Sequence, residues 1–209
     1  MACGDAVLTV GSDPAGVEVR LSSAGLCCPG CGDRLAPWGH GRARSVRGQG
    51  QLRWRLRPRR ARCSGCGVTH ILLPVSCLLR RADAVEVIGA ALVAAGAGWG
   101  HRRVAALVER AASTVRDWLR RFEARAGPVR EGFTALAVGV EPSPVMPEPT
   151  GSEVGDAVAA IMTAGQAVRS RWLRSLLGVS VWWVASAVTS GRLLAPALSM
   201  ESINTSRLW

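Results

Sequence analysis

Four cysteines in two short pairs are the residues of this chain best suited to chemistry. Cys28 and Cys31 form one C-x2-C pair, Cys63 and Cys66 form a second, and a glycine follows each pair directly. Four thiolates are the ligand set that a structural zinc ion prefers, because they complete its tetrahedral coordination and leave no position for a catalytic water. The glycine after each pair lets the backbone turn around the metal at positive φ. The spacing therefore predicts a structural zinc ribbon, with Zn2+ as the cofactor.

Two neighbouring residues compete for a place in this ligand set. Cys27 directly precedes Cys28, and His70 lies four residues after Cys66, so either one is an alternative ligand. The proline and glycine inside the first pair favour Cys28. The chain has seven cysteines and no recognisable signal peptide, which indicates a reducing cytoplasmic environment rather than a disulfide framework.

Positive charge is concentrated in one part of the chain. All 26 basic residues are arginines, against 15 acidic residues, and the formal net charge is +11. Residues 34–125 contain 19 of these arginines and only 5 acidic residues. Such a concentration is typical of a surface that binds phosphates. The alternative is a solvated basic face without a partner.

The segment between the cysteine pairs predicts a sheet with one arginine-rich face. Residues 51–57 alternate strictly, so their two leucines and Trp54 point one way and their arginines the other. Residues 42–47 are the expected hairpin partner, and residues 68–73 form a third strand. A guanidinium face cannot be buried against protein without a large desolvation cost, so we expect it to contact DNA phosphates. The residues assigned to this contact are Arg53, Arg55, Arg57, Arg59 and Arg60.

Residues 81–127 predict three helices. The first ends at Gly96, the second covers residues 101–109, and the third begins with Ser113 as its N-cap and has a regular apolar face. Three such helices are typical of a helix-turn-helix, whose last helix enters the major groove of duplex DNA. The residues expected near bases or phosphates are Arg102, Arg103, Ser113, Thr114, Arg116, Arg120 and Arg121.

Several motifs of this region resemble known DNA-binding segments. Residues 103–105 and 113–122 resemble the helix-turn-helix of insertion-sequence transposases and resolvase-like regulators. Residues 28–31, 38–40, 59–66 and 69–74 look like the N-terminal zinc ribbon of the same elements. Together they are similar to a family of small, uncharacterised proteins of high-GC bacteria that join a ribbon to a helix-turn-helix. The resemblance covers residues 26–125 and implies an association with mobile DNA. One departure is Glu109, which stands where the turn of such motifs usually carries glycine.

The remainder of the chain predicts helices without an active site. Carboxylates after Phe122 are scattered, so they do not suggest the converging acidic triad of a transposase nuclease. Residues 141–151 read as a proline-rich linker, and Ser152 is expected to cap a helix that reaches about residue 177. A second apolar segment covers residues 182–191. The uncharged segments 176–191 and 87–100 are too short to span a membrane. The two C-terminal helices are candidates for homodimer formation or for docking a transposase, with plain core packing as the alternative.

The sequence as a whole predicts an α+β protein that is mostly α. The expected divisions are an N-terminal extension with a strand at residues 17–21 (1–25), the zinc ribbon (26–80), the helix-turn-helix (81–127), the linker (128–151) and a helical C-terminal region (152–209). We expect a non-enzymatic, sequence-specific double-stranded DNA-binding protein of the cytoplasm, associated with the nucleoid when bound. The alternatives are a transposase-derived enzyme and a zinc ribbon that docks on protein.

Overall fold

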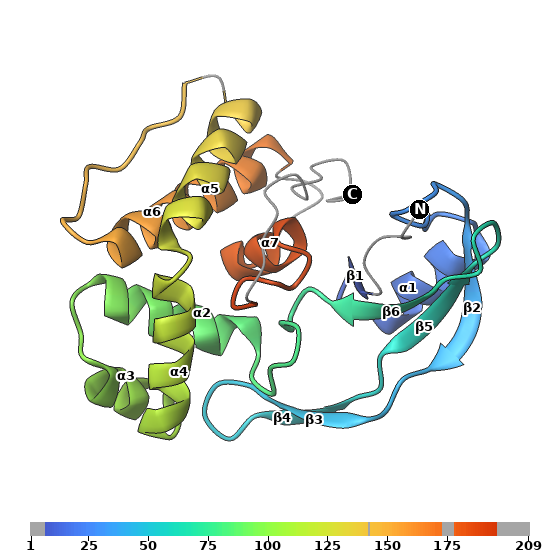
Figure 1. Cartoon of the computed structure of the whole chain (residues 1–209), viewed down its shortest axis with the longest axis horizontal. Helices are drawn as coiled ribbons and strands as arrows, with labels where there is room; N and C mark the ends of the chain where they lie inside the picture. The colour runs from blue at the N-terminus through green and yellow to red at the C-terminus, as the bar shows by residue number, and fades with distance from the viewer. Residues whose placement is uncertain (1–6, 142, 173–177, 196–209) are drawn as a thin grey trace.

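The computed structural model describes residues 7–141, 143–172 and 178–195. A strand-rich region (residues 7–80) comes first, and a group of helices follows it (Figure 1). The architecture is therefore α+β, as expected. A membrane-spanning helix is absent from the described residues, because no helix there is both long and apolar enough.

A four-stranded sheet forms the body of the strand-rich region, with the order β1-β6-β5-β2. Strand β1 (Val7–Val10) runs parallel to β6 (Thr69–Pro74), which pairs antiparallel with β5 (Arg59–Cys63). Strand β2 (Leu35–His40) completes the sheet as an edge. The third strand expected at residues 68–73 is thus confirmed as β6.

The N-terminal extension differs from the prediction, because residues 17–21 lie in a helix. Helix α1 (Pro14–Ser22) begins after Asp13, whose carboxylate accepts hydrogen bonds from the backbone of Ala15 and Gly16. Val17 and Leu21 lie one helical turn apart and are buried in the same small core as the sheet. The extension still supplies an edge strand, but that strand is β1.

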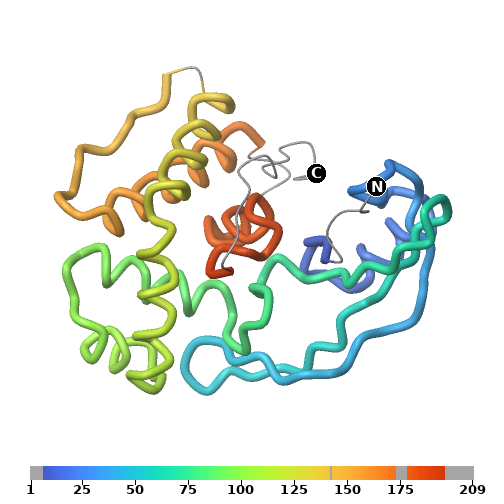
Figure 2. Tube along the Cα trace, in the orientation of Figure 1, coloured from blue at the N-terminus to red at the C-terminus, as the bar shows by residue number. Residues whose placement is uncertain are grey.

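Strands β3 (Arg44–Arg47) and β4 (Arg53–Leu56) confirm the expected hairpin. This hairpin arm (residues 44–56) continues β2 and β5, as Figure 2 shows, and reaches the helical part of the molecule. Val46 is fully buried there, while Trp54 and Leu56 pack against the same core. One face of the arm is thereby fixed to the helices.

Helices α2 (Val85–Gly96), α3 (His101–Val108) and α4 (Ala112–Glu123) match the three predicted helices. Glu109 ends α3 in the left-handed region, with φ 53° and ψ 48°. The predicted cap at Ser113 is wrong: Ala111 is the N-cap, without a side-chain hydrogen bond, and Ser113 lies inside the first turn. The start of α4 is set instead by the tight turn, in which the backbone N–H of Arg110 bonds to the carbonyl of Ala105.

Three further helices follow within the described residues. Helix α5 (Ala126–Val140) occupies most of the first part of the expected linker, because Val129, Phe133 and Leu136 bury one of its faces. Helix α6 (Glu153–Arg171) begins at Ser152, whose hydroxyl accepts from the backbone N–H of Gly155, as predicted. The expected end near residue 177 lies outside the described residues.

Helix α7 (Val181–Val188) confirms the second apolar segment and packs closely on its neighbours. A β-carbon added at Gly89 of α2 would lie 2.2 Å from the Trp182 ring, and one added at Gly165 of α6 would lie 2.4 Å from Val181. The buried faces of α6 and α7 therefore belong to the same core as α2, α3 and α4.

Candidate functional site

The four predicted cysteine ligands come together at one end of the sheet. The Sγ atoms of Cys28, Cys31, Cys63 and Cys66 all lie within 4.8 Å of one another. Cys28 and Cys66 are separated by 3.7 Å, and Cys31 and Cys63 by 3.3 Å. A tetrahedral zinc ion with bonds of about 2.3 Å to sulfur places its ligands about 3.8 Å apart. The cluster therefore fits a structural metal ion such as zinc.

Both cysteine pairs have the same backbone geometry. Gly32 has φ 81° and donates to the carbonyl of Cys28, and Gly67 has φ 72° and donates to the carbonyl of Cys63. This positive φ is the reason that glycine follows each pair. The backbone N–H of Cys66 points at Cys63 Sγ across 3.5 Å, and it lowers the pKa of that thiol to about 7. At Cys63 the fold thus favours the thiolate form that binds metal.

The two alternative ligands lie outside the cluster. Cys27 is exposed and belongs to a backbone bridge with Arg34. His70 is fully buried, and its Nε2 lies 3.4 Å from Cys28 Sγ, so it contacts one ligand rather than replacing one. Such a contact from a second layer of residues orients a ligand and supports its charge.

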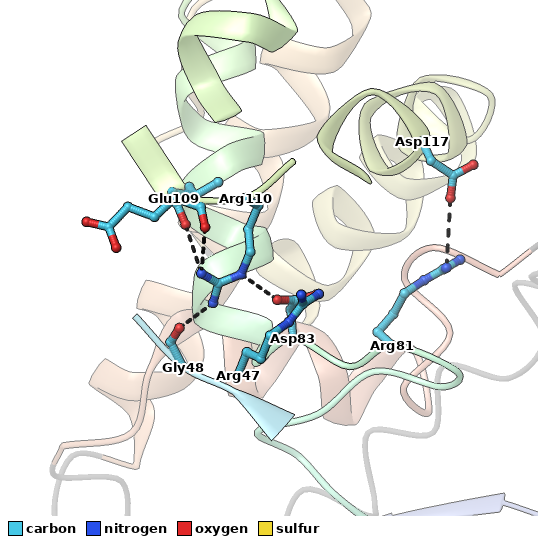
Figure 3. Close-up of polar contacts among 8 residues, drawn as sticks. Arg47, Gly48, Arg81, Asp83, Glu109, Arg110 and Asp117 are labelled. Carbon is cyan, nitrogen blue, oxygen red and sulfur yellow. Dashed lines mark hydrogen bonds and ion pairs between the residues drawn. The ribbon is translucent and has the colours of Figure 1, made fainter. Parts of the chain in front are cut away.

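A second polar centre holds the tip of the hairpin arm against the helices (Figure 3). The buried carboxylate of Asp83 accepts from Arg47 of β3 at 2.7 Å and from Arg110 of the α3–α4 turn at 2.6 Å. The Arg110 guanidinium also donates to the carbonyl of Gly48 at the hairpin tip. Backbone bonds from Arg47 to Ala82 and from Ala84 to Arg47 extend this contact, which we call the Asp83 clamp.

The Asp83 clamp was missed from the sequence. Its partners lie 36 and 27 residues from Asp83 along the chain, so no local spacing signals the contact. The one available clue was an acidic residue two positions after an arginine pair in a strongly basic part of the chain. The clamp matters because it places the arm beside the beginning of α4.

The predicted arginines of the strands divide into free and paired groups. Arg53, Arg55 and Arg57 are exposed, as the alternation predicted. Arg59 is different: its Nε lies 2.6 Å from a Glu18 carboxylate oxygen, and its guanidinium also donates to the carbonyl of Gly39. Arg60 is half-buried in β5. Three of the five assigned guanidinium groups are therefore fully open to a polyanion.

The predicted residues of α3 and α4 also differ in their surroundings. Ser113 and Arg116 are exposed on α4, Thr114 is half-buried beside them, and Arg102 is exposed in the first turn of α3. The guanidinium of Arg103 stacks on the ring of Trp99, 3.6 Å from its centroid. A stacked guanidinium keeps its outward N–H groups available to a phosphate.

Asp117 pairs with the remaining two predicted arginines. Its carboxylate lies 2.8 Å from Arg121, 3.2 Å from Arg120 and 3.9 Å from Arg81 of the segment before α2. A hydrogen bond from Arg121, and a weaker effect of one from Arg120, hold the pKa of Asp117 below its ordinary value. The charges of Arg120 and Arg121 are thus partly compensated by Asp117. Among the described residues, no carboxylate pairs with Arg116, the other arginine of the predicted contact set on α4.

Comparison with family models, curated proteins and solved structures finds no match to this chain. The likeness to transposase DNA-binding regions therefore rests on the quoted motifs alone.

Proposed function

We propose that this protein binds double-stranded DNA, with a zinc-stabilised sheet and the hairpin arm contacting phosphates and α3–α4 acting as a helix-turn-helix. The tight turn at Glu109 and the largely exposed outer face of α4 support the second part. The exposed side chains of Arg53 and Arg55 in the arm, and of Arg57 directly after it, support the first. An association with mobile elements or with transcription regulation follows from the motif resemblance.

The Asp83 clamp is the observation that carries this proposal. It joins the arm tip to the turn that precedes α4, so the free arginines of β4 and the start of α4 belong to one fixed unit. The first turn of a recognition helix faces base edges, and structures beside it meet the flanking phosphates. An arm held at this point is suited to follow the sugar–phosphate backbone next to the groove that α4 occupies.

A duplex selected from a random library provides the test. Replacing Arg116 with alanine is expected to weaken binding to the selected duplex by about 1–3 kcal/mol and to leave binding to random duplex much less affected, if Arg116 contacts a base. Replacing Arg53 and Arg55 with glutamine should weaken both duplexes equally, because phosphate contacts carry no sequence information. A library without any enriched sequence would contradict the proposal.

We further propose that zinc is the metal of the four-cysteine cluster and that its role is structural. Four thiolate ligands leave no open position on the ion, and metal binding at such a site is coupled to folding. The purified protein should contain one zinc per chain. Replacing Cys28 and Cys31 with serine should remove the metal and the fold of the sheet, whereas the matched change Cys27→Ser should keep both. Loss of zinc in the Cys27 variant would overturn the ligand assignment.

A further inference from the structure

The sheet has an outer face that the helical core covers only in part. Partner residues in the sheet share a face, so Thr9 and Leu73 lie on the same side. Leu73 is buried in the helical core, and the Thr9 hydroxyl reaches the carbonyl of Ala187 at the end of α7. Helix α7 thus covers the β1 side of this face.

The other half of the same face is open. Ile71 lies two residues before Leu73 on β6 and is 37% exposed. Its partner on β5 is Arg60, and two residues further along β5 comes Arg62, which is exposed. Strand β2 forms the edge of the sheet beside β5 (Figure 1). The open half therefore consists of outward residues from β6, β5 and β2.

Trp38 of β2 is the largest side chain of this open half. Its side chain is attached to an edge strand, and the residue is 49% exposed. The guanidinium of Arg62 lies over the ring, 4.7 Å from its centroid, and Arg62 Nε is held by the carbonyl of Gly67 at 3.2 Å. The arginine therefore covers one side of the ring and fixes its orientation. Because the residue is about half exposed, part of the ring surface remains accessible to a ligand.

The charge around this ring favours a polyanion over a protein. No carboxylate pairs with Arg60 or Arg62 in the described ranges, so both guanidinium groups keep their full charge. A flat aromatic ring beside an uncompensated arginine, with a second arginine on the same strand, offers stacking to a nucleobase and ion pairing to its phosphates. Bases within a duplex are already stacked on both sides, so only an unpaired base can use the ring.

We propose that this open half of the sheet binds single-stranded DNA, with one unpaired base stacked on Trp38 and its flanking phosphates on Arg60 and Arg62. The choice of DNA over RNA rests on the proposed function; the stacking site itself does not. It uses no residue of α3 or α4. A protein with both sites would engage a duplex next to a strand that has been opened.

Binding of fluorescein-labelled dT12 to the zinc-loaded full chain tests this site, with fluorescence anisotropy as the readout. Trp38→Ala should weaken binding at least about fivefold, because an alanine substitution removes the stacking of one base. Trp38→Phe should stay within about threefold of the original affinity, because a smaller ring still stacks. Circular dichroism and zinc content verify that both variants are folded. Val138→Ala, a change at an exposed position of α5 outside both proposed sites, serves as the control and should leave dT12 binding unchanged.

Three results would overturn the inference. Equal affinity of the Trp38→Ala variant and the unchanged protein for dT12 would show that the ring is not used. An equal loss in the alanine and phenylalanine variants would exclude stacking, and Trp38-dependent binding of rU12 without binding of dT12 would refute the choice of DNA. Failure of duplex binding is a separate outcome: Trp38-dependent dT12 binding without duplex binding would contradict the proposed function and leave this site standing.

Discussion

Replacing Asp83 with asparagine removes the charge that holds the hairpin arm to the helices. The side chains of Asp83 and Arg110 are 3% and 6% exposed, and that of Arg47 is 37% exposed. Removing one partner of a buried ion pair typically costs about 3–5 kcal/mol, because the remaining charge stays buried without compensation. The Arg47 side chain is more than a third exposed, so its pairing with Asp83 contributes less. We therefore expect a loss of about 3 kcal/mol in the free energy of unfolding.

Thermal melting of the zinc-loaded protein measures this loss. For a chain of this size, about 3 kcal/mol should lower Tm by about 6–12 °C. Glu18→Gln is the matched control, because it removes a carboxylate that pairs with Arg59 and is 50% exposed. Such a surface pair contributes at most about 1 kcal/mol. If the Asp83→Asn and Glu18→Gln variants have the same Tm, the Asp83 clamp does not stabilise the fold.

The same variant distinguishes the effect of the arm's position on duplex binding from the effect of the protein's net charge. Asp83→Asn makes the protein more positive, and added positive charge alone should strengthen duplex binding. The clamp predicts the opposite, because an unfixed arm no longer lies beside α4. Weaker duplex binding by a folded Asp83→Asn protein would support the clamp, and stronger binding would refute its role in placing the arm.

Three other predictions follow from single residues. Gly89→Ala should lower the free energy of unfolding by about 1–3 kcal/mol in urea titrations, because the new methyl group would meet Trp182. The control Gly139→Ala, on the open face of α5, should raise it by up to about 1 kcal/mol. Glu109→Gly should raise the unfolding free energy by about 0.5–1 kcal/mol because it relieves a left-handed φ, and a loss instead would contradict the turn. Asp117→Asn should lower stability by up to about 1 kcal/mol at neutral pH. Because the pKa of Asp117 is lowered in the folded protein, the stability difference between the two proteins should reach its full size above about pH 4 and disappear as the pH falls through the folded pKa. A difference that persists in acid would contradict the pairing of the Asp117 carboxylate with its arginines.

Local patterns predicted the parts of the fold whose causes are local. The two cysteine pairs carry their own turn glycines, and the alternation of residues 51–57 was enough to place the hairpin and its exposed arginines. Helices α3 and α4 were found because each has one apolar face, and α2 and α7 because each is a largely apolar segment that ends near a glycine. The metal cluster followed from the same short-range spacing.

The errors arose where two patterns compete in one short segment. Val17, Val19 and Leu21 alternate like a strand, yet Asp13 followed by proline is a helix start, and only Val17 and Leu21 are buried. Helix α5 was overlooked because its glycines and proline resemble a linker, although Val129 and Phe133 are spaced as one helical face. The helix start signal at Asp13 would have resolved the first case, and the apolar spacing of α5 the second.

Long-range contacts could not be predicted from the sequence. The Asp83 clamp joins three segments, and the stacking of Arg62 on Trp38 depends on the register of β2 and β5. Neither has a signature in residue spacing. The pairing of Arg59 with Glu18 likewise depends on α1, whose position follows from tertiary packing.

The salt dependence of duplex binding tests the central claim most directly. If the arm and the helices contact about six phosphates, the logarithm of the association constant should fall with the logarithm of salt concentration at a slope of about −5. Replacing Arg53, Arg55 and Arg57 with glutamine should reduce that slope to about −2, because each lost phosphate contact removes about 0.9. A flat salt response of the unchanged protein, or an unchanged slope in the triple variant, would contradict the account.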